Sequence, residues 1–329
     1  MSTTNPRPGT GGRPLVSVVL PTYKRSELLA RSIDSVLKQT YSKWELLIVD
    51  DNDPGSSYRE STERFMKRYA GEPRIRYLRH DRNRGGSAAR NTGIREARGE
   101  LVAFLDDDDE WHPEKLGLQV QALQEAGPQT ALVYTGFTMV VPEKNEVRDL
   151  LASHGRHDLP SLLERNTIGT TSTVMARRSA LLDVGLFDET LASRQDIDLY
   201  VRIARDYRIT AISRPLVTWY RHDGEAIGKN PQASIAAHQL FLAKYREELA
   251  AHPAAHRERL FALAQHLLAG GEIDRARERL NAALRIGPPT PALLFYKALA
   301  TRPGHLCYLG GLRLKALARS LRVGRTRVS

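Results

Sequence analysis

The sequence is poor in cysteine and has no long apolar run, and each of these absences excludes a class of protein. Its 329 residues include a single cysteine, Cys307, which excludes an intramolecular disulfide framework and favours a reducing compartment. No uninterrupted apolar run reaches the roughly 18 residues of a membrane-spanning helix. The polar stretch from Met1 to Arg13 also lacks the apolar core of a signal peptide. We therefore expect a cytoplasmic protein.

Signature motifs of several cofactor classes are absent as well. The histidines and the cysteine show no zinc-site spacing, and no GxxxxGK[ST] sequence occurs. The turn after the first expected strand has no glycine fingerprint for a dinucleotide, so hydride transfer and P-loop phosphoryl transfer are both disfavoured. The composition is 41% hydrophobic with a formal net charge of +11, which indicates a globular chain attracted to an anionic partner. That partner could be a nucleic acid, a membrane surface or a phosphorylated substrate.

The pattern of apolar residues predicts an α/β fold. From residue 15 to about 135, short β-branched segments alternate with amphipathic ones, as in a parallel sheet flanked by helices. After a looser region with one expected helix from Asp196 to Asp206, residues 225 to 300 look purely helical. The expected strands are Val16 to Leu20, Leu46 to Val49, Ile75 to Leu78, Leu101 to Leu105 and Ala131 to Tyr134, and the helices between them are Ser26 to Gln39, Ser57 to Tyr69, Ser87 to Ala97 and Pro113 to Ala126.

Four consecutive aspartates, Asp106 to Asp109, follow the strand that ends at Leu105. Such a run repels itself unless a cation holds it, and carboxylate oxygens are ligands that suit magnesium or manganese. Ligands of open α/β sheets bind at the ends of the strands. We therefore predict a divalent metal that grips a diphosphate, the alternative being a solvated acidic turn. At two other strand ends, Asp51 and Thr22 could form hydrogen bonds with a pyrimidine base. Alternatively, each could be a turn residue whose hydrogen bonds are made within the protein.

Five ordered motifs at these positions resemble glycosyltransferase family 2, whose members have the GT-A fold. The resemblance covers roughly residues 15 to 222. It implies a nucleoside-diphosphate sugar donor, by default a UDP-sugar, and Mn²⁺ or Mg²⁺ held by a DxD-type motif. The motifs are Val16 to Tyr23, Ser35 to Tyr41, Glu45 to Asp51, Asn83 to Ile94 and the aspartate run.

The resemblance assigns roles to individual residues. Asp108 would be the direct metal ligand, with Asp106 or Asp107 near the ribose or the metal. Thr22 and Asp51 would contact the base, and Arg90 and Asn91 would line the floor of the donor site; for Arg90, the alternative is a cation on a helix surface. The donor-site residues implied in this way are Pro21, Thr22, Tyr23, Asp51, Arg90, Asn91, Asp106 and Asp107.

The family places its general base in an acidic pair at a helix start, and Asp196 matches that position. Here the sequence departs from the family pattern, because Gln195 stands where glutamate is usual, which could change how the acceptor is positioned. Asp196 could instead be a helix cap, with Asp198 paired to Arg202 one turn later. The segment Tyr220 to His222 resembles the family's closing basic segment, so Arg221 or His222 could lie near the diphosphate.

The C-terminal part has two features of its own. Apolar residues from Leu260 to Pro288 follow the spacing of one tetratricopeptide unit, with Gly270-Gly271 at the turn, although an ordinary helical hairpin is the stronger expectation. Residues 301–329 carry basic side chains and no acidic one. This basic tail predicts docking on an anionic membrane surface at its inner face, or else a solvated tail. Its cations are Arg302, Arg313, Lys315, Arg319, Arg322, Arg325 and Arg327.

Together these features predict an inverting hexosyltransferase that moves a sugar to a hydroxyl of a glycan or lipid-linked acceptor, in cell wall or surface polysaccharide biosynthesis. Two alternatives are a sugar nucleotidyltransferase, which would normally carry a glycine-rich basic loop after the first strand, and a basic adaptor or degenerate donor-binding protein. No nucleic acid is expected, because the basic tail lacks interleaved aromatics. The expected organisation is a disordered tail at residues 1–13, the GT-A domain at 14–224, the helical extension at 225–300 and the basic tail.

Overall fold

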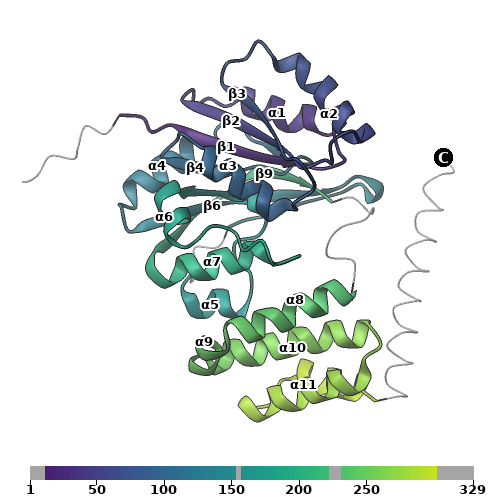
Figure 1. The fold of residues 1–329 in the computed structure, drawn as a ribbon. Helices are drawn as coiled ribbons and strands as arrows, with labels where there is room; N and C mark the ends of the chain where they lie inside the picture. Colours follow the sequence, from purple (N-terminus) through teal and green to yellow (C-terminus); the bar gives the residue numbers. More distant parts are fainter. Residues whose placement is uncertain (1–11, 153–156, 222–230, 302–329) are drawn as a thin grey trace, which may run out of the picture.

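A nine-stranded mixed sheet lies at the centre of the protein. The computed structural model describes residues 12–152, 157–221 and 231–301. The strands follow the order β3-β2-β1-β4-β8-β6-β9-β5, and β7 pairs with β6 (Figure 1). Their bounds are β1 Val16–Thr22, β2 Trp44–Asp50, β3 Ile75–Arg79, β4 Leu101–Phe104, β5 Glu110–Trp111, β6 Thr130–Val141, β7 Glu146–Leu150, β8 Val174–Arg177 and β9 Arg208–Tyr220.

The predicted α/β class is confirmed, with the five expected strands in their expected order. The pairings β3-β2-β1-β4 and β6-β9 are parallel. The short strand β8 inserts between β4 and β6 and runs antiparallel to both, so β6 does not extend the parallel array directly. This insertion joins segments about seventy residues apart, which local patterning cannot reveal. The edge strands β5 and β7 are also antiparallel to their neighbours.

Helices cover both faces of the sheet. Val18 and Leu20 of β1 pack on one face and Val19 on the other, because successive strand residues point in opposite directions. The first face packs against α1, α2 and α4, and the second against α3, α5, α6 and α7. The helices of this domain are α1 Leu29–Leu37, α2 Ser57–Met66, α3 Gly86–Glu96, α4 Lys115–Glu125, α5 Leu159–Glu164, α6 Arg178–Asp183 and α7 Gln195–Asp206, with 3-10 turns at Lys67–Tyr69, Pro142–Lys144 and Thr171–Thr173.

The C-terminal extension is helical and has a core of its own, as the sequence indicates. Helices α10 and α11 pack against each other, with the turn at Gly270-Gly271, where Gly271 has φ +80°. The apolar residues predicted to share a face are buried in one cluster. The hairpin is therefore present, and its likeness to a tetratricopeptide unit stays a prediction. The helices are α8 Pro231–Lys244, α9 Arg246–Ala251, α10 Pro253–Ala269, α11 Ile273–Ile286 and α12 Pro291–Leu299.

The extension docks on the α/β domain beneath α5 and α7 (Figure 1). The ammonium of Lys244 lies 2.6 Å from a carboxylate oxygen of Asp188 and 2.6 Å from one of Asp198. The Tyr245 hydroxyl donates to Asp198 at 2.6 Å, and Arg259 donates to the backbone carbonyl of Leu162 at 2.8 Å. Because Asp198 is on α7, the extension helps to hold that helix in place.

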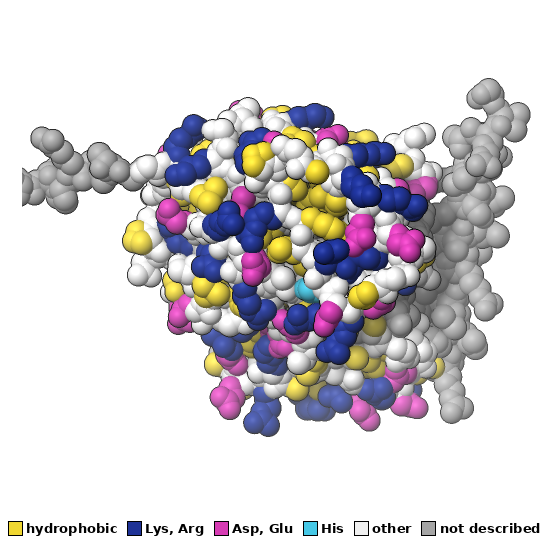
Figure 2. All heavy atoms as spheres, turned by 45° about the horizontal axis from the view of Figure 1, so that its top comes forward, with side chains coloured by type: hydrophobic (Ala, Val, Ile, Leu, Met, Phe, Trp, Pro, Cys, Tyr) yellow, Lys and Arg dark blue, Asp and Glu magenta, His cyan; other side chains and the backbone are white. Residues whose placement is uncertain are grey.

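Some predictions fall outside the described residues. His222, the basic tail beyond Thr301 and residues 1–11 are among them. In the parts of the chain that the structure describes, no helix has both the length and the apolar character needed to span a membrane. Figure 2 shows lysines and arginines spread over one face and interleaved with acidic side chains instead of gathered in a single stripe.

Candidate active site

Three parallel strands end at the same edge of the sheet, and their terminal residues meet there. Strand β1 pairs with β2 on one side and with β4 on the other, so Thr22, Asp51 and the aspartate run come together. The Thr22 hydroxyl donates to a carboxylate oxygen of Asp107 at 2.8 Å. Pro21 is half-buried within β1, whereas Tyr23 is exposed just beyond it. The structure thus brings together residues that the sequence placed at separate strand ends, and their predicted roles stay predictions.

The four aspartates have different environments, and these distinguish the one that faces the interior from those that could face a ligand. Asp109 is fully buried and accepts a bond from the Ser172 hydroxyl at 2.5 Å, so it faces the inside of the domain. Asp108 accepts from the Arg25 guanidinium at 2.6 Å. Asp106 accepts from Arg90 at 2.5 Å. Burial and the neighbouring charge of Asp108 raise the pKa of Asp107 to about 7, although Arg25 and Thr22 oppose the shift.

Asp106 and Asp108 are suited to share a divalent cation with a phosphorylated ligand. Among the described residues, no group of three or more His, Cys, Asp or Glu side chains is arranged to hold a metal ion alone. Asp106 is ion-paired with Arg90, and Asp108 with Arg25, so both carboxylates lie where they attract a cation. Magnesium is commonly held by one or two carboxylates together with phosphate oxygens and water. The residues therefore fit a metal that a bound diphosphate helps to hold.

Asp51 organises the glycine-containing loop that leads into α3. One of its carboxylate oxygens accepts from the His80 ring at 2.7 Å and from the Arg84 amide at 2.8 Å. The other accepts from the Asn83 side chain at 2.9 Å and from the Gly85 amide at 2.8 Å. Gly85 has φ +86°, a conformation that favours glycine. The predicted contact of Asp51 with a base stays a prediction, since four donors already engage its carboxylate.

Replacing Asp51 by asparagine is expected to destabilise the protein by about 2 to 4 kcal/mol. The new amide nitrogen would face the donors of Asn83 and Gly85 in place of an acceptor. Urea unfolding at equilibrium measures the change. Asp53→Asn is the matched control, because exposed Asp53 accepts one bond, from the Asn83 amide, which an amide oxygen can still accept. Equal stabilities of the two variants would contradict this role for Asp51.

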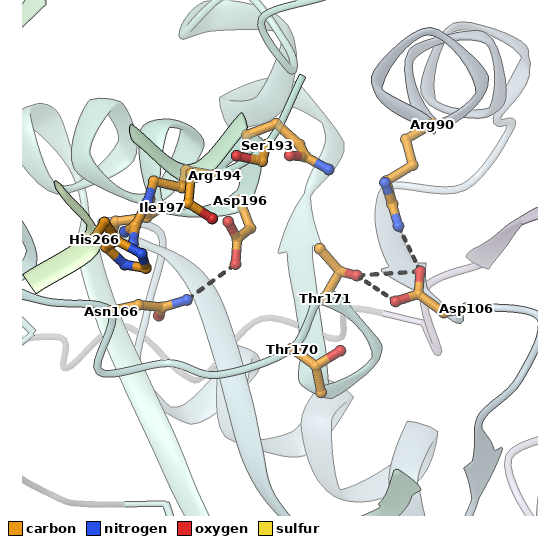
Figure 3. A pocket seen from close by; sticks show the side chains of 12 residues that line it. Arg90, Asp106, Asn166, Thr170, Thr171, Ser193, Arg194, Asp196, Ile197 and His266 are labelled. Atoms are coloured by element: carbon orange, nitrogen blue, oxygen red, sulfur yellow. Dashed lines mark hydrogen bonds and ion pairs between the residues drawn. The ribbon is translucent and has the colours of Figure 1, made fainter. Parts of the chain in front are cut away.

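A cavity of about 470 Å³ connects the aspartate run to the start of α7. In Figure 3, the pair of Arg90 and Asp106 lies on one side and Asp196 on the other. The Thr171 hydroxyl donates to Asp106 at 3.0 Å. The lining residues are Arg90, Asp106, Asn166, Thr170, Thr171, Ser193, Arg194, Gln195, Asp196, Ile197, Ser234 and His266.

Asp196 lies in the first turn of α7, where the sequence placed the general base. The Asn166 side chain donates to one of its carboxylate oxygens at 3.0 Å. Burial raises the pKa of Asp196, an effect that the backbone amide of Ile197 and the charges of Arg90 and Arg194 partly offset. Asp198 is buried and pairs with Arg202 at 2.9 Å, as its spacing suggested. A carboxylate of raised pKa in a cavity is well suited to accept a proton.

Three other predicted residues have different positions. Asn91 is buried and exchanges two hydrogen bonds with the Phe187 backbone, so it braces the segment after α6 and is not among the cavity-lining residues. Arg221 is exposed at the end of β9, and it too is outside that set. Gln195 does line the cavity.

Sequence reasoning missed Asn166, Ser234 and His266. Asn166 lies in an irregular segment with no periodicity to draw attention to it. Ser234 and His266 belong to α8 and α10, whose apolar spacing indicated only helices that pack. The extension thus contributes directly to the cavity wall, which no local signal could have shown.

Comparisons with known proteins show which family the chain resembles. The model of a family described as "Glycosyl transferase family 2" matches residues 17–190 of the chain. The chain is 33% identical over 195 residues to the putative colanic acid biosynthesis glycosyl transferase WcaA of Escherichia coli K12, a match that covers 59% of this chain and 67% of WcaA. It is 30% identical over 217 residues to the UDP-Glc:alpha-D-GlcNAc-diphosphoundecaprenol beta-1,3-glucosyltransferase WfgD of Escherichia coli, covering 66% and 80%.

Solved structures show the same fold at low sequence identity. Residues 1–349 of Staphylococcus aureus TarS, in complex with UDP-GlcNAc, superpose with a TM-score of 0.66 at 18% identity, covering 90% of this chain and 92% of that one. The mannosyltransferase PcManGT of Pyrobaculum calidifontis, in complex with GDP-Man and Mn²⁺, gives a TM-score of 0.54 at 21% identity, covering 91% and 84%.

Proposed function

Because this chain belongs to glycosyltransferase family 2, we propose that it is an inverting, metal-dependent enzyme that uses a nucleoside-diphosphate sugar, by default a UDP-sugar. Its acceptor would be a hydroxyl of a glycan or lipid-linked saccharide in surface polysaccharide assembly. The observation that carries this proposal is that Asp196 and Asp106 line one cavity. A base and a donor-binding carboxylate on opposite walls leave room for the sugar between them.

The reaction follows from these positions. The acceptor hydroxyl attacks the anomeric carbon of the donor and its proton passes to Asp196, while the bond from that carbon to the diphosphate oxygen breaks. Asp106 and Asp108 would hold a divalent metal, which neutralises charge on the departing nucleoside diphosphate. Attack from the side opposite the leaving group inverts the anomeric configuration. Asn166 keeps the Asp196 carboxylate oriented toward the cavity through its 3.0 Å hydrogen bond.

The relatives support the choice of substrates. WfgD is named for a UDP-glucose donor and a diphosphoundecaprenol-linked acceptor, and two further relatives are a putative teichuronic acid glycosyltransferase of Bacillus subtilis and an amylovoran glycosyltransferase of Erwinia amylovora. The TarS structure contains UDP-GlcNAc, and the PcManGT structure contains GDP-Man together with Mn²⁺. A sugar-nucleotide donor and a polysaccharide precursor as acceptor are thus the first substrates to assay.

Calorimetric titration with UDP, GDP and CDP, each with manganese and with EDTA, tests the donor site. We expect one nucleotide, UDP by default, to bind with manganese and to lose most of its affinity in EDTA, because phosphate oxygens complete the metal coordination. The preferred nucleotide then selects the sugar donors for turnover assays. Absence of binding by all three would contradict the proposal, and binding without turnover of any matching donor would indicate a degenerate donor-binding protein.

A further inference from the structure

The cavity lining includes residues of the C-terminal extension and a cation, Arg194, from the start of α7. Arg194 lies immediately before α7 in a left-handed conformation, φ 63°, that is uncommon for a residue with a side chain. Ser234 of α8 and His266 of α10 also line the cavity. Figure 3 shows Arg194 and His266 together on the side of the cavity that holds Asp196, away from Asp106.

The guanidinium of Arg194 has a neutral imidazole as its neighbour. It donates to the His238 ring at 2.5 Å, and the His238 and His266 rings lie 4.7 Å apart. Burial, followed by the charge of Arg194, lowers the pKa of His238 to about 2, so His238 is neutral near pH 7. Among the described residues, no carboxylate lies within ion-pair distance of Arg194, and Asp196, the closest in sequence, instead accepts from Asn166.

The surroundings of Arg194 contrast with those of the other cations of the site. Arg90 and Arg25 each face a carboxylate at 2.6 Å or less. Partly burying a cation without an anion costs free energy, and burial indeed lowers the pKa of Arg194. Arg259, deeper in the same region, adds positive charge and donates to backbone carbonyls. An anion that entered this end of the cavity could therefore accept a charge-assisted hydrogen bond from Arg194. No carboxylate among the described residues accepts such a bond from it.

We propose that Arg194, with Ser234 and His266, forms a subsite for an anionic group of the acceptor. The donor diphosphate belongs at the Asp106 end, whereas Arg194 shares the start of α7 with Asp196, which faces the acceptor hydroxyl. The group is a phosphate that links the acceptor to a carrier or a carboxylate on the acceptor sugar. This inference rests on the proposed function, because only that function makes the ligand an acceptor. Binding of an anion at Arg194 can nevertheless be measured without turnover.

Imidazole NMR of the full chain at constant pH tests the subsite directly. The probes are methyl phosphate and methyl glucuronide, with methyl glucoside as a neutral comparison, and His266→Gln and His238→Gln assign the signals. We expect one anion to shift both signals saturably and methyl glucoside to leave them in place. Arg194→Gln should lower the affinity for that anion at least about tenfold, because one charge-assisted hydrogen bond is lost. Saturation by methyl phosphate identifies the linking phosphate, and saturation by methyl glucuronide identifies the sugar acid.

Two controls keep the test decisive. Arg285→Gln removes an equal charge from an exposed site on α11 and should leave the anion affinity unchanged. Arg194→Lys retains the charge and should retain most of the binding if Arg194→Gln folds poorly. If neither anion shifts the signals of the unsubstituted protein, or if Arg194→Gln binds as well as the parent, the subsite is overturned. Because this readout needs neither donor nor turnover, its failure would be distinct from a failure of donor binding.

Discussion

Asp196→Asn is expected to lower sugar transfer by about 10²- to 10⁴-fold, the usual contribution of a positioned general base. An amide cannot take the proton of the acceptor hydroxyl, but it nearly matches the carboxylate in size and can still accept from Asn166. Nucleotide binding should therefore be unchanged, because Asp106, the donor-side carboxylate that lines the cavity, lies across it from Asp196 (Figure 3). Steady-state transfer rates and calorimetric nucleotide affinities, measured on the same preparation, separate the two effects.

Asp206→Asn is the matched control for this substitution. Asp206 is exposed at the far end of the same helix, so its change should leave the transfer rate within about twofold, as for surface substitutions in general. Full activity of Asp196→Asn would exclude it as the base. Equal loss in both variants would instead indicate damage to α7.

The same residue sets a pH dependence. Burial raises the pKa of Asp196 above 3.8, the ordinary value for an aspartate. The base acts as the carboxylate, so transfer is lost as the pH falls through this raised pKa and is retained above it. The acid limb of the pH–rate profile should accordingly lie above pH 3.8, and it should be absent from the residual rate of Asp196→Asn.

Asp108→Asn is expected to weaken metal-dependent nucleotide binding at least tenfold, roughly the smallest effect of disturbing a metal site. The substitution removes one of the two carboxylates suited to share a metal with the diphosphate. It should have little effect on binding in EDTA, since only the metal-dependent part of the affinity is lost. Titration of UDP with manganese and with EDTA, for parent and variant, measures the difference.

The control for Asp108→Asn is a carboxylate far from the cavity. Asp274 on α11 has a side chain that is 87% exposed, and Asp274→Asn should bind UDP like the parent under both conditions. If Asp108→Asn keeps the full manganese-dependent gain in affinity, the metal does not depend on this carboxylate. Asp106→Asn would then be the next variant to titrate, because Asp106 faces the cavity from the same strand end.

Local sequence patterns were sufficient for the five expected strands and for the helices between them, but not for β5, β7, β8, β9, α5 or α6. The apolar segments of β1, β2 and β4 were predictable because buried strands are recognised by short β-branched runs bounded by polar turns. The hydrogen bond between Thr22 and Asp107 was not predicted, although the parallel arrangement of those strands explains it. The sequence could not show which of the four aspartates faces a ligand, because four identical residues in a row give no local signal that distinguishes them. Only the packing of Asp109 against Ser172 separates it from the other three.

The sequence by itself determined the α/β class, the position of Thr22, Asp51 and the aspartate run at strand ends and the position of Asp196 at a helix start, because these depend on residues near one another in the chain. The tertiary structure alone decided which distant groups share the cavity. Strand β8 enters the sheet beside β4, and α8 and α10 bring Ser234 and His266 into the lining of the cavity that also contains Arg194. Such contacts join segments tens of residues apart, and they form through packing of whole helices and sheet faces rather than through any local preference of the chain.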